Sequence, residues 1–151
     1  MKRREILLVG TTAAVAQSLL TATGCHAKGG TTAAAAVISS SESGSFAAEA
    51  GACVQAGEAC LSHCLRLLGD GDTSLGPCAI TVREMLAVCR AVETLALADS
   101  KHLASAAALC ANVCEDCRVE CEKHAGHHAE CKACAEACER TIAAAKAIAA
   151  A

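Results

Sequence analysis

Aromatic side chains are almost absent from this sequence. It contains no Trp or Tyr, a single Phe at Phe46 and a single Pro at Pro77. Strands draw on aromatic and β-branched residues, so this scarcity argues against a sheet. Alanine, the strongest helix former, dominates the 54% of residues that are hydrophobic. The composition therefore predicts an all-α protein.

A strong charge of either sign is absent as well. The formal net charge is −3, from 13 basic and 16 acidic residues. The sequence has no basic face interleaved with aromatics, so nucleic acid is not an expected partner. With 151 residues, the chain has room for one domain of ordinary size.

The sequence has no long, uninterrupted hydrophobic run. Residues 6–20 come nearest, but they are short and weakly apolar for a stable membrane span. Arg3 and Arg4 precede this stretch and the small residues 21–27 follow it, which is the three-part order of an export signal. The adjacent arginines favour a twin-arginine signal, with an ordinary secretory signal as the alternative. We therefore expect residues 1–27 to direct export to the periplasm.

Two processing sites compete at the end of this signal. Cleavage after Ala27 fits a small-x-Ala site and is the preferred interpretation. The alternative is a degenerate lipobox that leaves Cys25 lipidated and the protein tethered. Residues 28–44 are rich in Gly, Ser, Thr and Ala, and we interpret them as a flexible leader.

The remaining residues, 45–151, predict an antiparallel up-down four-helix bundle with short connections. Residues 69–72 form a turn, and Pro77 lies in the first turn of the second helix, where a missing N–H is tolerated. Asp99 or Ser100 is expected to cap the third helix, and Gly126 to end it. The four helices are expected at about 45–68, 74–98, 100–125 and 127–149.

Cysteine is the residue in excess, with 13 copies, of which twelve lie beyond the signal. On each predicted helix the cysteines recur at intervals of three, four, seven or eleven residues, which places them on one face within roughly 60°. Four such stripes together indicate one feature built by all four helices, a cysteine-lined core. The twelve are Cys53, Cys60, Cys64, Cys78, Cys89, Cys110, Cys114, Cys117, Cys121, Cys131, Cys134 and Cys138.

Apolar residues continue the cysteine stripes toward one end of the bundle. Phe46, Leu103 and Ile142 extend the stripes of the first, third and fourth helices. Together with Leu95 they predict an apolar plug at that end. Met85 lies on the stripe of the second helix, either as a metal ligand or as core filling.

Packing and disulfides are the two interpretations without a metal. A buried Cys behaves as a small hydrophobe, which accounts for one or two copies but not for twelve on aligned stripes. A disulfide between Cys110 and Cys114, or between Cys134 and Cys138, would close a very small loop and strain the helix. Bridges between helices remain an alternative.

Thiolates and thioethers at helical spacing favour a soft metal ion, and charge distinguishes Cu(I) from Zn²⁺. Twelve thiolates with about twelve Cu⁺ are neutral, whereas three Zn²⁺ with four thiolates each would bury a charge of about −6. Zinc sites also favour knuckles on loops over uninterrupted helical stripes. The sequence therefore predicts multiple Cu(I) ions per monomer.

Histidines gather where the predicted bundle ends opposite the plug. His124, His127 and His128 lie at the connection of the last two helices, and His63 is near the turn at the same end. Imidazole binds copper, so these four are candidate accessory ligands at a mouth through which copper passes. The alternative is that they are ordinary polar residues around a turn.

Four segments, residues 56–64, 71–74, 114–121 and 127–134, resemble the four-helix-bundle copper storage proteins, in particular the exported kind. The resemblance covers about residues 45–140 and combines cysteine spacing, a turn and a histidine pair. It implies reversible loading with many Cu(I) ions, a homotetramer, and copper supply to copper-requiring enzymes or chaperones.

The chain departs from the family pattern at two places. The stripe of the last helix stops at Cys138, with Thr141 at the next position, and the second helix has only two cysteines. Storage by coordination, without enzymatic activity, is the expected function. The alternatives are a thiol-based zinc or toxic-metal buffer, a thiol–disulfide redox protein, and a structural exported protein that binds no metal.

Overall fold

The computed structural model describes residues 38–151, and the predicted signal and most of the predicted leader lie outside them. The described part consists of four α-helices and one short 3₁₀ helix. Their bounds are α1 Ser40–Gly69, η1 Thr73–Leu75, α2 Gly76–Leu97, α3 Leu103–Glu122 and α4 Ala129–Ala149. The all-α prediction is confirmed.

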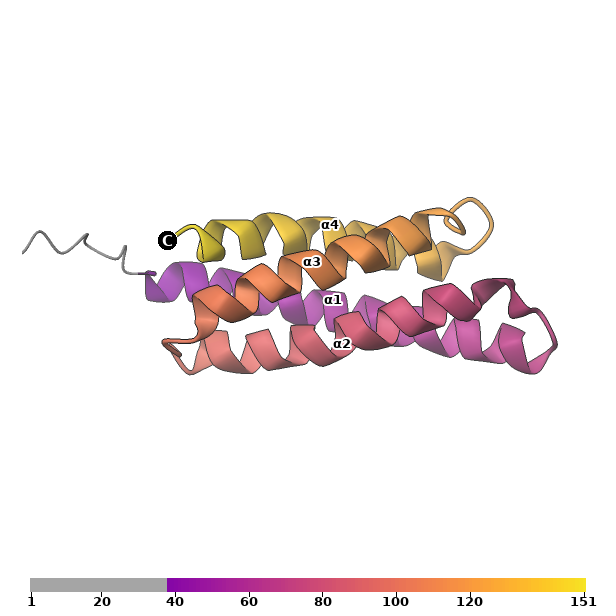
Figure 1. The fold of residues 1–151 in the computed structure, drawn as a ribbon, viewed down its shortest axis with the longest axis horizontal. Helices are drawn as coiled ribbons and strands as arrows, with labels where there is room; N and C mark the ends of the chain where they lie inside the picture. Colours follow the sequence, from indigo (N-terminus) through magenta and orange to yellow (C-terminus); the bar gives the residue numbers. More distant parts are fainter. Residues whose placement is uncertain (1–37) are drawn as a thin grey trace, which may run out of the picture. The chain divides into compact units, whose positions relative to one another are not determined.

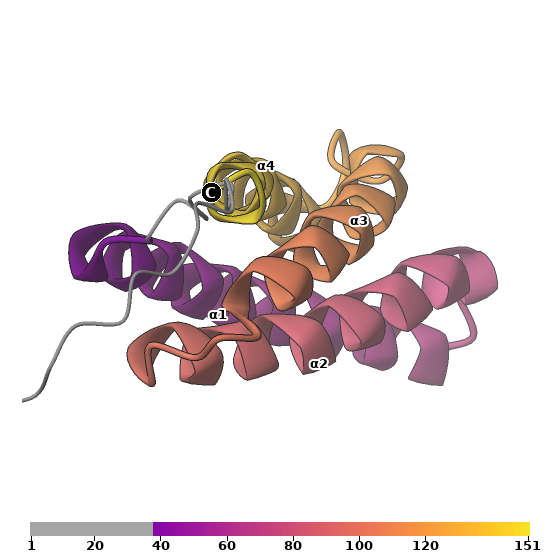
Figure 2. The same cartoon turned by 60° about the vertical axis from the view of Figure 1, so that its left-hand side comes forward.

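The helices run alternately up and down and form a four-helix bundle (Figure 1). Each helix packs against two neighbours, in the closed order α1, α2, α3, α4 and back to α1. The α1–α2 and α3–α4 connections lie together at one end, and the α2–α3 connection and the C-terminus lie at the other (Figures 1 and 2). The predicted antiparallel topology is therefore confirmed.

Helix α1 begins at Ser40, earlier than the expected start at Ser45, so the last residues of the predicted leader are helical. The reason is a capping box. Ser39 accepts a hydrogen bond from the backbone N–H of Glu42, and the Glu42 carboxylate accepts one from the backbone N–H of Ser39. These bonds satisfy N–H groups that a helix start otherwise leaves open.

The start of α3 is also displaced from its predicted position. Neither Asp99 nor Ser100 caps this helix, which begins at Leu103 after His102. Asp99 has a φ of 47°, in the left-handed region, and ends the turn that follows α2. The Ser100 hydroxyl accepts a hydrogen bond from the His102 N–H within the connection, so it is not available to α3. At its other end α3 stops at Glu122, before the predicted position, and α4 begins at Ala129.

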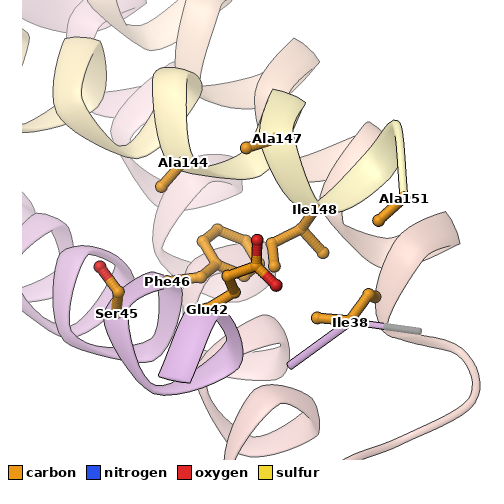
Figure 3. Close-up of a pocket in the computed structure, with 8 residues that line it drawn as sticks. All are labelled: Ile38, Glu42, Ser45, Phe46, Ala144, Ala147, Ile148 and Ala151. Carbon is orange, nitrogen blue, oxygen red and sulfur yellow. The ribbon is translucent and has the colours of Figure 1, made fainter. Parts of the chain in front are cut away.

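The end of the bundle near the α2–α3 connection is apolar. We call it the apolar end and define it by five buried residues. Phe46 of α1 lies against Ile148 of α4 there, beside a pocket of about 130 Å³ that Ile38 also lines (Figure 3). The predicted plug is confirmed, although Leu95 is only partly buried. The five residues are Phe46, Val92, Leu103, Ile142 and Ile148.

Among the described residues, no helix is both long enough and apolar enough to cross a membrane.

Candidate metal centre

All twelve cysteines of the described chain are 0% exposed, and all are free thiols. They reach the interior because the spacing of three and four residues keeps each series on the inward face of its helix. The predicted cysteine-lined core is therefore confirmed. Outside the sulfurs, the only buried polar side chains in the described part are Ser43 and Thr141.

The sulfur atoms contact one another both within and between helices. Between helices, Sγ–Sγ distances are 3.6 Å for Cys78–Cys121 and 3.6 Å for Cys89–Cys114. Within α3, the separation one helical turn apart is 3.9 Å for Cys117–Cys121. A disulfide bond is about 2.05 Å long. The sulfurs therefore lie at distances that a metal ion can bridge but that are too long for a disulfide.

Five groups of cysteines within the described chain have all their sulfurs within 4.8 Å of one another. Four of the groups have three members, and one has four. Shared members connect them, because Cys60, Cys134, Cys138 and Cys114 each belong to two groups. A continuous path of sulfur ligands thus runs along the interior. In order, the groups are Cys60/Cys64/Cys78/Cys131, Cys60/Cys121/Cys134, Cys117/Cys134/Cys138, Cys53/Cys114/Cys138 and Cys89/Cys110/Cys114.

Burial and neighbouring sulfurs shift the acidity of the thiols. Burial, reinforced by the charge of a Cys78 thiolate, raises the pKa of Cys64 to about 11 and that of Cys131 to about 12. Hydrogen bonds from Cys117 and Cys121 act in the opposite direction and lower the pKa of Cys134. A thiolate is therefore most stabilised where several S–H groups can donate to one sulfur.

Met85 lies in contact with the sulfur path. Its Sδ is 3.4 Å from Cys53 Sγ, so it is placed as a thioether ligand would be. Gly57, on the cysteine face of α1, makes room for it. A Cβ at Gly57 would lie 2.5 Å from the Met85 methyl carbon and 3.0 Å from a Leu86 methyl. The sequence placed Met85 on the stripe, but the close approach of Gly57 appears only in the packed bundle.

Thr141 ends the ligand series of α4 toward the apolar end. Its hydroxyl donates to the carbonyl of Ala137 at 2.9 Å and lies 3.2 Å from the carbonyl of Glu49. The second contact reaches across to α1, where Glu49 lies one turn before Cys53. The hydroxyl is thus engaged with backbone oxygens, and the ligand series of α4 ends at Cys138.

At the other end of the bundle, His63 and His128 form a hydrogen-bonded pair. His63 Nε2 is 2.8 Å from His128 Nδ1, and an Arg66 nitrogen is 2.9 Å from His63 Nδ1. Arginine can only donate, so a neutral His63 accepts at Nδ1 and donates its Nε2–H to His128. Glu130 Oε1 lies 3.4 Å from the same Nδ1 and can pair with it only if the ring is protonated.

His124 lies beside this pair. Its ring centroid is 6.4 Å from that of His128, and its buried Nε2 has no hydrogen-bond partner. The nearest carboxylate, Glu120 Oε1, is 3.8 Å away. A buried nitrogen without a partner is costly, so His124 has a lone pair or proton available to a ligand. His127 is exposed on the connection and apart from the cluster.

The structure therefore brings together three of the four predicted histidines, and it adds neighbours that the sequence analysis did not select. Arg66, Glu120 and Glu130 complete what we call the histidine end. Glu120 precedes His124 by four residues and Arg66 follows His63 by three, so helical spacing could have indicated both. The histidine end is defined by His63, Arg66, Glu120, His124, His128 and Glu130.

Three comparisons with known proteins bear on this centre. A sequence model of the family described as copper storage protein matches residues 39–150. The chain is 34% identical over 88 residues to the uncharacterized cysteine-rich protein YhjQ of Bacillus subtilis (strain 168), covering 57% of this chain and 79% of the relative. The solved structure of the Cu(I)-bound copper storage protein BsCsp3 is 29% identical, with a TM-score of 0.65, and the match covers 72% of this chain and 98% of that one.

Proposed function

The chain belongs to the copper storage protein family, and from that premise we propose that it stores many Cu(I) ions, about one per core cysteine. The observation that carries the proposal is the continuous path of twelve buried sulfurs, with neighbouring groups sharing members. Thiolates are among the ligands that Cu(I) prefers in proteins. The solved structure similar to this chain is also described as Cu(I)-bound.

Charge supports about one copper ion per sulfur. Within the described part of the chain, no Lys, Arg, Asp or Glu is buried in the core. A buried charge without a partner is unfavourable by several kcal/mol or more. Twelve thiolates and about twelve Cu⁺ sum to zero, so a fully loaded core holds no net charge. Each thiol loses its proton on binding, and the protons leave with the solvent.

Copper passes, in this proposal, through the histidine end. All twelve thiols are fully buried, so an ion needs a local opening and a first ligand. The His63–His128 pair and the unpartnered Nε2 of His124 supply nitrogen ligands there. Exchange from sulfur to sulfur then carries ions along the path of shared groups toward Cys89 and Cys110.

Coordination, and not catalysis, is the proposed activity. A thiol–disulfide enzyme needs an accessible, low-pKa cysteine, whereas every described thiol is fully buried. We also propose that the protein folds before twin-arginine export to the periplasm, which would enclose the thiols before they meet an oxidising compartment. Tetramer formation and copper supply to copper-requiring enzymes or chaperones follow from the family resemblance and belong to the same proposal.

The test is an anaerobic Cu(I) titration of the reduced chain in a Cys25→Ser background, so that only core thiols count. The expected end point is about twelve Cu(I) per monomer, read by metal analysis after removal of unbound copper. Saturation at one or two ions would show that storage is wrong. Serine at Cys89, Cys110 and Cys114 together, far from the histidine end, is expected to lower the capacity by about three ions.

A further inference from the structure

One of the five cysteine groups differs from the rest in having four members. Cys60 and Cys64 of α1, Cys78 of α2 and Cys131 of α4 have all four sulfurs within 4.8 Å of one another. We call these residues the quartet. The other groups in the described chain have three sulfurs each. A single Cu(I) ion needs only two or three sulfurs, whereas four sulfurs together can complete a tetrahedral site.

The sulfur separations in the quartet match a tetrahedral site. The Sγ of Cys60 is 3.8 Å from that of Cys131 and 4.0 Å from that of Cys78. Four sulfurs at the usual zinc–sulfur distance of about 2.3 Å are about 3.8 Å apart at the corners of a tetrahedron. Since all six separations are within 4.8 Å, small side-chain movements suffice to bring the four sulfurs to the corners of a tetrahedron around Zn²⁺.

The quartet lies next in sequence to residues of the histidine end. A tetrathiolate zinc site carries a charge of −2, which is unfavourable in a core without cations. His63 is adjacent in sequence to Cys64, and the Arg66 guanidinium is 2.9 Å from the His63 ring. Arg66 and the neighbouring imidazoles are the groups of the histidine end that can offset this charge.

We propose that the quartet binds one Zn²⁺ in the copper-free protein. Four thiols lose four protons, and the metal forms four bonds to sulfur without any change of oxidation state. The proposal rests on the proposed function, since it assumes the same reduced thiols, and it adds a divalent ion at the histidine end of the copper path. Zinc there occupies the first sulfurs that incoming copper meets, and Cu(I) enters by replacing it.

Cobalt(II) is a suitable probe because the visible ligand-field bands of a tetrahedral tetrathiolate site lie at longer wavelength than those of sites with fewer sulfur ligands. Anaerobic Co²⁺ titration of the copper-free chain, in the Cys25→Ser background, is expected to give these bands with one equivalent, and Zn²⁺ is expected to remove them. Cys131→Ser should abolish the tetrathiolate spectrum. The matched variant Cys110→Ser, in the group farthest along the path, should leave it unchanged.

Three results would overturn the zinc site: no tetrathiolate bands, bands lost equally in both variants, or a stoichiometry well above one. Cys64→Ser serves as a second quartet variant if Cys131→Ser does not fold, as judged by its helical circular dichroism. The copper titration separates the two proposals. About twelve Cu(I) without a cobalt spectrum leaves storage standing and refutes the zinc site, whereas one or two Cu(I) with a cobalt spectrum does the reverse.

Discussion

The two ends of the bundle are built on the same four helices and the same alanine-rich background, yet their chemistry differs. The histidine end has imidazoles, an arginine and two carboxylates around the four-sulfur group. The apolar end has Phe46, Leu103 and Ile148 as large buried side chains, and Thr141 follows the last cysteine of α4 toward that end. This difference fits the proposal that ions pass through the histidine end, while the large side chains of the apolar end hold the helices together.

This division has a physical reason. A core of thiols and alanines buries little apolar area per side chain, so a copper-free bundle depends on its few large residues. Copper ligands must exchange and rearrange, and this favours contacts that can break. With the large side chains at one end and the polar ones at the other, the residues that stabilise the bundle are separate from those that must move.

The largest expected effect is the pH dependence of copper binding near the histidine end. Cys64 and Cys131, with pKa values raised to about 11 and 12, stay protonated throughout the neutral range. Each proton that copper displaces weakens the apparent affinity about tenfold for every unit that the pH falls. Competition with a chromophoric Cu(I) ligand at pH 6, 7.5 and 9 measures the apparent affinity for Cu(I) at each pH. An affinity independent of pH would contradict the protonated state of these thiols.

Phe46→Ala is expected to have the next largest effect, on stability alone. Removing this ring should lower the free energy of unfolding of the copper-free protein by about 3–5 kcal/mol, measured by urea denaturation. Copper capacity should stay the same. Ile148→Val, with an expected loss of about 0.5–1.5 kcal/mol, is the milder variant if Phe46→Ala does not fold. A lower copper capacity in either variant would show that the apolar end also contributes to copper binding.

Replacing His63 and His128 together by Ala is expected to act on copper uptake and not on capacity. Loss of the hydrogen-bonded pair removes two of the three nitrogen ligands proposed at the mouth and leaves His124, so the uptake rate should fall about tenfold. Stopped-flow transfer from a chromophoric Cu(I) complex gives the rate. His102→Ala is the matched control, since His102 is exposed beside the α2–α3 connection. Equal rates in all three proteins would place the mouth elsewhere.

Thr141→Cys is expected to have the smallest effect, and it extends the sulfur path into the apolar end. The new thiol replaces a hydroxyl at a fully buried position one turn beyond Cys138. Capacity should rise by one Cu(I), with a change in stability of less than about 1.5 kcal/mol. Thr141→Ser keeps the hydroxyl and should leave the capacity unchanged. Metal analysis at saturation gives the number of Cu(I) ions bound by each variant. If Thr141→Cys binds no additional Cu(I), position 141 lies outside the sulfur path.

Much of the fold follows from spacing alone. The cysteine series predicted four inward faces, and all twelve thiols are buried. Helix ends were less predictable, because they depend on which of several nearby side chains forms the hydrogen bond to the backbone. The Ser39–Glu42 box starts α1 early, and Asp99 takes a left-handed conformation instead of capping α3. Capping residues have several partners within reach, and sequence does not rank them.

The sequence predicted which residues belong to the candidate site, but not which of them lie together in space. Spacing along a helix fixes which residues share a face, so Cys117 and Cys121 follow from sequence. It does not fix how helices are displaced along one another, and this displacement decides that Cys60, Cys64, Cys78 and Cys131 form a group of four. The same holds for His63 and His128, which lie 65 residues apart and meet at 2.8 Å.

The sequence by itself determined the class of fold, the inward position of the sulfurs and the chemical class of ion, because each depends on residue type and helical period. The tertiary structure alone decided that the sulfurs join into one path, that Gly57 admits Met85 beside Cys53, and that the Thr141 hydroxyl bonds across to α1. These features depend on distances of a few ångströms between helices, which the packing of all four helices sets together.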